Sequence, residues 1–171
     1  MSVTGQDVEF AIALPDEWTY IDLLDPDVAE WADAELASVL AAAREAGEAA
    51  QMLMMRSLIT HTPEGEPLTV GLTVALAEPE TPIASQPLTD LSALGAEPSA
   101  VQLPAGSGVR VKRIVRTPPL GEPAELSMLS VQYLLHTRLG LLTIGFTTGQ
   151  ASHPEAWEQL FDAMAATAEL A

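Results

Sequence analysis

Cysteine is absent from this sequence, and basic residues are scarce. Without cysteine the chain has no disulfide, no thiol nucleophile, no iron–sulfur cluster and no cysteine-ligated zinc. Only 7 lysines and arginines stand against 24 aspartates and glutamates, which gives a formal net charge of −17. Such a surface repels phosphate backbones and anionic lipid, so we expect neither nucleic acid nor a membrane as partner. Over long range it attracts a basic protein surface.

Long apolar runs are absent too. No stretch approaches the roughly 20 apolar residues of a membrane-spanning helix. The N-terminal residues 1–7 carry neither the basic nor the apolar part of a secretory signal. We therefore expect a cytoplasmic protein. Its 171 residues, 48% of them hydrophobic, suit a single domain over residues 1–171 with a core of its own.

The short motifs of familiar catalytic sites are also missing. The chain contains no G-x-S-x-G, no P-loop and no G-x-G-x-x-G. Its three histidines are not spaced as helical metal ligands, so we predict no metal and no cofactor. His61 and His136 both fall at the ends of predicted strands and can be neighbours if those strands pair. An enzyme that uses dispersed Asp, Glu and His residues therefore stays an alternative.

Alternation of apolar with other residues predicts most of the secondary structure. Short connections between successive strands favour antiparallel pairing. The predicted strands are Val8–Leu14, Gln51–His61, Pro67–Ala77, Val109–Thr117, Leu126–Thr137 and Leu139–Thr148, with a short extended segment over 18–23.

Two amphipathic helices are predicted beside these strands. The first begins at Asp25-Pro26, an N-cap acceptor followed by proline, and runs to about Ala46. The second follows the capping box Ser152-x-x-Glu155 and closes the chain. Its apolar stripe consists of Trp157, Leu160, Phe161, Met164 and Ala168. We therefore predict an α+β domain, an antiparallel sheet of roughly six or seven strands with an N-terminal and a C-terminal helix packed on it.

A long connection separates the first strands from the later ones. Residues 78–108 are rich in proline, serine, alanine and glycine, with at most one helical turn around Leu88–Leu94 and a short strand at Val101–Leu103. A connection of this length inside one domain is typical of functional or mobile segments, so we expect it to be the most mobile part of the chain.

The order of these elements resembles the PsbP-like superfamily. The opening Phe10-Ala-Ile-Ala-Leu-Pro-Asp-Glu-Trp18 is similar to the edge strand, turn and tucked aromatic of those domains. Leu141-Leu-Thr-Ile-Gly-Phe146 and the helix with Leu160-Phe161 resemble their ending. The superfamily includes photosystem accessory subunits, a Ran-binding protein, actinobacterial lipoproteins and chaperones of secretion-system effectors. The resemblance implies a non-enzymatic protein without shared catalytic residues, and this chain has no cysteine to carry a lipid.

One strand concentrates much of the scarce positive charge. Arg110, Lys112 and Arg116 share one side of it by period two, opposite three valines. This stripe predicts either a contact with an acidic partner or anionic small molecule, or pairing with the molecule's own carboxylates.

Methionine clusters at the start of another strand. Met52 and Met54 are predicted to share a face, and methionine suits adaptable binding surfaces as well as ordinary cores. Together with the basic stripe, this strand supplies the candidate partner-binding residues.

The favoured function is a non-catalytic protein-interaction module of an accessory, chaperone-like or immunity type. Its partner would be another protein with an apolar or basic contact surface, and a homodimer stays open. The first alternative is a carrier that holds a small apolar ligand in a pocket between sheet and helices. An enzyme is the second alternative.

Overall fold

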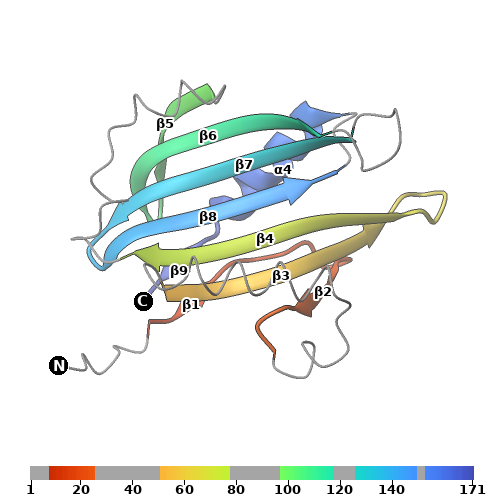
Figure 1. Ribbon diagram of the computed structural model, residues 1–171. Helices are drawn as coiled ribbons and strands as arrows, with labels where there is room; N and C mark the ends of the chain where they lie inside the picture. The colour runs from red at the N-terminus through yellow and green to blue at the C-terminus, as the bar shows by residue number, and fades with distance from the viewer. Residues whose placement is uncertain (1–7, 26–50, 78–96, 118–125, 150–152) are drawn as a thin grey trace.

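An antiparallel sheet of seven strands dominates the computed structural model, which describes residues 8–25, 51–77, 97–117, 126–149 and 153–171. Figure 1 shows the strands side by side in the order β2-β3-β4-β8-β7-β6-β5. Their bounds in chain order are β2 Thr19–Asp22, β3 Gln51–His61, β4 Pro67–Ala77, β5 Glu97–Leu103, β6 Gly106–Thr117, β7 Leu126–Thr137 and β8 Gly140–Thr148. The predicted antiparallel sheet is confirmed, and the strands β3, β4 and β7 have their predicted bounds.

The predicted long connection is partly wrong. Residues 97–117 form an antiparallel hairpin in which Glu97 to Leu103 pair with Lys112 to Gly106. The proline and glycines that resembled loop composition have places in this hairpin, since an edge strand tolerates proline and a close backbone approach requires glycine. Residues 78–96, the rest of the predicted connection, lie outside the described residues.

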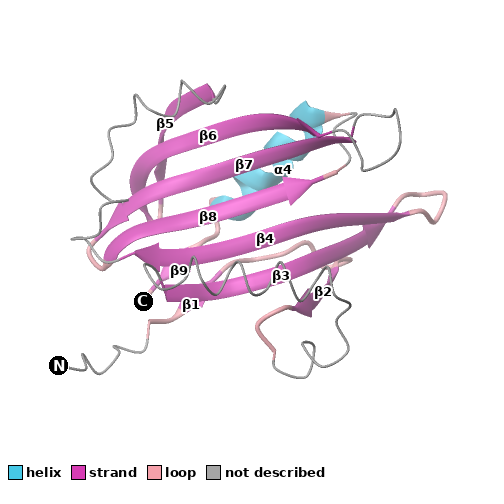
Figure 2. Ribbon diagram, in the orientation of Figure 1, coloured by secondary structure: helices cyan, strands magenta, loops and turns pink. Residues whose placement is uncertain are grey.

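The described residues contain one helix, α4, over Pro154–Ala165 (Figure 2). Its N-cap is His153, which makes no side-chain capping bond, and Ser152 of the predicted capping box lies outside the described residues. Pro154 fits the first helical turn because its fixed φ suits a helix and its missing N–H would have no partner there. The predicted helix from Asp25 to Ala46 falls outside the described residues.

The predicted first strand is much shorter in the structure. Only β1, Phe10–Ala11, is a strand, and it pairs with β9, Glu169–Leu170, in a separate two-stranded sheet. Backbone hydrogen bonds between Glu9 and Ala171 extend this clasp. Alternation of apolar residues could not distinguish a strand of the main sheet from an extended segment that runs beside the C-terminal residues.

The core lies between α4 and one face of the sheet, called the helix face. It consists of Met54, Leu58, Val70, Leu72, Val74, Leu76, Leu129, Val131, Tyr133, Leu135, Leu142, Ile144, Phe146, Phe161, Met164, Ala165 and Ala168. Phe161 of α4 stacks on Phe146 of β8 at 4.8 Å between ring centroids, and on Trp157 at 5.7 Å. Trp18 meets Trp157 edge-on at 6.3 Å, so the N-terminal turn joins the same stack.

The other face of the sheet is turned toward the viewer in Figure 1, with α4 behind, and is called the front face. Because side chains alternate along a strand, the front face takes every second residue. By register these are the odd positions of 55–61, 67–77, 141–147 and 107–113, and the even positions of 128–136 and 98–102.

Two glycines of β6 set the path of the β5–β6 hairpin. A Cβ built on Gly108 would lie 1.9 Å from the Leu134 carbonyl oxygen, and one on Gly106 would lie 2.5 Å from that of His136. No side chain fits in either place. The backbone of β6 therefore approaches β7 this closely at their crossing only because both residues are glycine. This crossing carries the end of the hairpin toward the core, where Val101 and Leu103 pack.

We expect Phe161→Ala to lower the free energy of unfolding by about 3–5 kcal/mol, because it removes a fully buried ring from the stack. Urea unfolding followed by circular dichroism measures the change. Gln159→Ala, an exposed position of the same helix, is the control and should stay within about 0.5 kcal/mol of wild type. Equal stabilities of the two variants would contradict this account of the core.

Gly108→Ala should destabilise the domain by about 1–3 kcal/mol, as overpacking does, because the added methyl group meets backbone rather than a side chain that can move. Gly149→Ala is the matched control, since a Cβ there meets nothing within 4 Å. Thermal melts of the two variants make the comparison, and a Gly108→Ala protein as stable as Gly149→Ala would mean that the crossing is not tight.

Candidate functional site

The described part of the chain contains neither a grouping of metal-binding side chains nor a membrane-spanning helix. Within it, no group of three or more His, Asp or Glu side chains is placed to hold a metal ion. Among the described residues, none of the helical stretches has the length and hydropathy of a membrane-spanning helix.

The structure keeps His61 and His136 apart. Their strands, β3 and β7, do not pair, because β4 and β8 lie between them. His61 lies opposite Pro67 at the β3–β4 turn, whereas His136 lies opposite Leu141 at the β7–β8 turn. Leu141 is also the partner of Ala77, at the other end of β4. The two histidines therefore occupy opposite ends of the sheet, and no acid–base pair forms from them.

A polar network joins β6 to α4 on the helix face. Arg110 donates from Nε to Asp162 Oδ1 at 2.7 Å and from an Nη to Glu158 Oε1 at 3.0 Å. Lys112 Nζ lies 3.1 Å from the other Glu158 oxygen. The Tyr133 hydroxyl donates to the same Asp162 oxygen. The side chains of Arg110, Lys112 and Glu158 are only 16–22% exposed, so solvent screens the two ion pairs of Glu158 weakly, whereas Asp162 is 48% exposed.

The network shifts the pKa values of Glu158, Arg110 and Tyr133. Burial opposes ionisation of Glu158, but hydrogen bonds from Arg110 and Lys112 outweigh it and hold the pKa of this carboxyl below its ordinary value. Burial likewise opposes the charge of Arg110, but the bonds to Asp162 and Glu158 raise its pKa above the ordinary value. Burial and the hydrogen bond to Asp162 raise the pKa of Tyr133. At neutral pH the charged pairs and the neutral phenol are therefore all favoured.

Two of the three predicted stripe residues are engaged inside the molecule. Arg110 and Lys112 lie on the same side of β6, as predicted, and pair with the carboxylates of α4. This is the second of the two interpretations that the sequence allowed. The backbone of Arg116 continues the stripe in register, opposite Ser127 of β7.

The shared face predicted for Met52 and Met54 is wrong. Met52 lies opposite Ala75 and Met54 opposite Val74, because the register shifts between them and leaves Leu53 as an extra residue. Such a β-bulge puts the two methionines on opposite faces. Met54 is 9% exposed and belongs to the core, and Leu53 packs against it. Strict alternation cannot reveal a bulge, so the sequence offered no warning.

The front face differs from the rest of the molecule in charge. None of β3, β4, β6, β7 and β8 contains an aspartate or glutamate, although the chain has 24 of them. Arg113 is the one lysine or arginine among the described positions of this face. The described carboxylates occupy turns and loops, α4 and the strands β2, β5 and β9 instead, for example Glu64 and Glu66 in the turn before β4. Among its described residues, the front face therefore carries a single positive charge and no negative charge.

Hydroxyl and amide groups line the middle of this face. The group called the hydroxyl patch consists of Thr69, Thr73, Thr147, Ser130 and Gln132, from β4, β8 and β7. Thr69, Thr73 and Gln132 are exposed. A Cβ built on Gly71 would lie 2.7 Å from Thr147 Oγ1, and one on Gly145 3.0 Å from Thr73 Oγ1. The threonine hydroxyls thus occupy the space above the glycines, and the patch is flat.

Sequence reasoning missed the hydroxyl patch. The signal was present, because five of the six predicted strands, all but Val8–Leu14, lacked acidic residues in an acidic chain. Acidic residues are uncommon in strands generally, so the pattern gains meaning only when the register shows which residues share an exposed face.

Tyr20 and Arg56 form a second feature that was not predicted. The Arg56 guanidinium carbon lies 4.1 Å from the centre of the Tyr20 ring, and Tyr20 is 50% exposed. Their strands β2 and β3 pair, with Tyr20 opposite Leu58 and Asp22 opposite Arg56, so both positions belong to the helix face. The Nε of Arg56 is buried without a hydrogen-bond partner. A cation–π contact of this kind stabilises the β2 edge.

Comparison with protein-family models, with curated proteins and with solved structures finds no match for this chain.

Glu158→Gln should lower the free energy of unfolding at pH 7 by about 1.5–3 kcal/mol, because it removes charge-assisted bonds from both Arg110 and Lys112. The pKa of Glu158 is lowered by folding, so this contribution is present above its unfolded pKa of about 4.3 and is lost as pH falls through the folded value. Urea unfolding at a series of pH values measures it.

Glu155→Gln, at an exposed position of the same helix, is the control for this experiment. It should cost at most about 0.3–1 kcal/mol, through the helix dipole alone. A Glu158→Gln effect that persisted unchanged at pH 2 would contradict the assignment to the ion pairs.

Proposed function

We propose that this chain is a non-catalytic protein-interaction module that binds another protein through the front face of its sheet. The observation that carries the proposal is the exposed hydroxyl patch on a face that has no carboxylate among its described residues, in a chain of net charge −17. An acidic protein that bound nothing on this face would gain solubility from acidic residues there, as it does elsewhere.

The chemistry of the face defines the partner. Hydroxyl and amide groups form hydrogen bonds with a partner at a lower desolvation cost than carboxylates do. The surrounding carboxylates attract positive charge over a longer range and accelerate encounter at low salt. We therefore expect a partner surface that is polar but uncharged in its centre and basic at its rim, which keeps the basic alternative of the sequence prediction rather than the apolar one.

The alternatives have less support. The carrier requires a pocket between sheet and helix, but in the described residues this space is occupied by the stack of Phe146, Phe161 and Trp157. The dispersed-residue enzyme depended on His61 and His136, which lie at opposite ends of the sheet. The PsbP-like resemblance stays part of the proposal, because accessory and chaperone-like members of that superfamily act by binding proteins. The expected cytoplasmic location stays part of it as well.

Gln132→Glu should weaken partner binding by about tenfold or more, since it places a carboxylate in the centre of the hydroxyl patch, where desolvating it is costly. Affinity capture with the wild-type chain, followed by mass spectrometry, identifies the partner. Surface plasmon resonance with that purified partner then compares the variants.

The matched control is Gln159→Glu, the same change at an exposed position of α4, behind the sheet (Figure 1). It adds the same charge to the molecule without touching the front face. If both variants bind the partner as tightly as wild type does, the front face is not the contact surface. If both are weakened equally, net charge rather than the hydroxyl patch controls binding.

A further inference from the structure

The strand β5 forms one edge of the sheet. It is the last strand in the order and pairs only with β6 among the described residues. Pro98, Ser99, Ala100 and Gln102 are exposed. An edge strand of this length presents a row of N–H and C=O groups to which another strand can bond.

The position of Pro98 shows which groups point outward. A proline in an edge strand occupies a site whose nitrogen faces away from the neighbouring strand. The β5–β6 ladder has no register shift between Glu97 and Leu103, so alternate residues share this orientation. The N–H groups of Ala100 and Gln102 therefore face outward, beyond the single protective proline.

This edge lacks the usual electrostatic protection. Natural edge strands are commonly guarded by charged residues, lysine above all. From Pro98 to Leu103 β5 has no charged residue, although the chain as a whole carries a net charge of −17. Pro98 blocks one end of the edge and leaves the stretch from Ala100 to Leu103 available for pairing.

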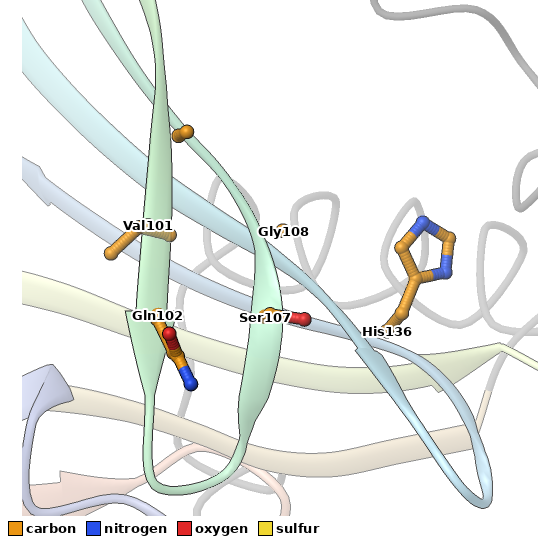
Figure 3. A pocket seen from close by; sticks show the side chains of 6 residues that line it. Val101, Gln102, Ser107, Gly108 and His136 are labelled. Atoms are coloured by element: carbon orange, nitrogen blue, oxygen red, sulfur yellow. The ribbon is translucent and has the colours of Figure 1, made fainter.

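A depression adjoins the same stretch. Its volume is about 480 Å³, and it is lined by Ala100, Val101, Gln102, Ser107, Gly108 and His136. Gln102, Ser107 and His136 lie opposite one another across β5, β6 and β7, and Figure 3 shows them following one another across the three strands. Gly108 contributes no side chain, so the depression depends on the same close crossing of β6 over β7 described above.

We propose that the outer edge of β5 binds an extended segment of a partner protein as an added strand, with one uncharged side chain of that segment in the depression. Main-chain hydrogen bonds to Ala100 and Gln102 supply affinity, as in strand addition generally, and the depression supplies specificity. Gln102, Ser107 and His136 offer polar groups to that side chain, while Ala100 offers apolar contact.

Charge argues for a different protein rather than a second copy as the occupant. Pairing β5 with its own symmetry mate would bring two chains of net charge −17 together along an edge without basic residues. A segment with lysine or arginine beside its central residues avoids this repulsion and is attracted to the acidic surface. The inference rests on the proposed protein-binding function but concerns a separate contact surface.

The probe is a display library of random extended peptides, selected on the immobilised full-length chain. Peptides bound at β5 should bind Ala100→Pro about tenfold more weakly, because that variant loses one outward N–H. Ser99→Ala is the control, since it lies outside the lining of the depression and keeps every outward N–H, and it should bind as wild type does. Exchange of the Ala100 and Gln102 amide protons, followed by NMR, should slow when the peptide is added.

Ala100→Lys, which guards the edge without removing the N–H, serves as a second variant if Ala100→Pro fails to fold. Peptides that bind wild type and the edge variants equally, or leave the two amides unprotected, would overturn the proposal. A concentration-dependent dimer that Ala100→Pro abolishes would overturn it in favour of a second copy. A partner sensitive to Gln132→Glu but not to Ala100→Pro would leave the front-face function intact and reject the edge alone.

Discussion

The attachment of α4 to the sheet is the constraint on which the rest of the fold depends. It combines an apolar contact and a polar one, because Phe161 stacks on Phe146 while Glu158 and Asp162 of the same helix bond to Arg110 of β6. The ring stack fixes how close the helix lies, and the charged bonds fix its rotation about its own axis. Removing only one partner of such a network leaves the others buried and unsatisfied.

This attachment also divides the surface of the molecule. Two of the seven basic residues, Arg110 and Lys112, serve α4, and Arg56 stacks on Tyr20. Little positive charge is left for a contact with an acidic ligand on the helix face. The front face carries no helix of the described chain, has no carboxylate among its described residues and meets the uncharged β5 edge at Gln102. This division of the surface is the basis of the proposed contact with another protein.

The sequence predicted the repetitive parts of the fold well. Period-two alternation gave Gln51–His61 and Pro67–Ala77 with their observed bounds, because strands buried on one face must alternate. It failed where geometry breaks the period. The bulge at Leu53 separates Met52 from Met54, and the β5–β6 hairpin resembles a loop in composition. Arg110 and Lys112 were placed on one face correctly, but only the docked position of α4 shows which carboxylates they meet. The hydroxyl patch depends on the order of β4, β8 and β7, which local pattern does not contain.

The glycines beneath the hydroxyl patch have a consequence for hydration. Because the Thr147 and Thr73 hydroxyls lie over Gly71 and Gly145, these two glycines open no recess in which an apolar side chain of the partner can be buried. Association there removes water mainly from hydroxyl and amide groups and little from apolar surface. A large negative heat-capacity change is the thermodynamic mark of apolar burial. The heat-capacity change of binding through this face should therefore be small. A small change distinguishes this contact from docking into an apolar groove.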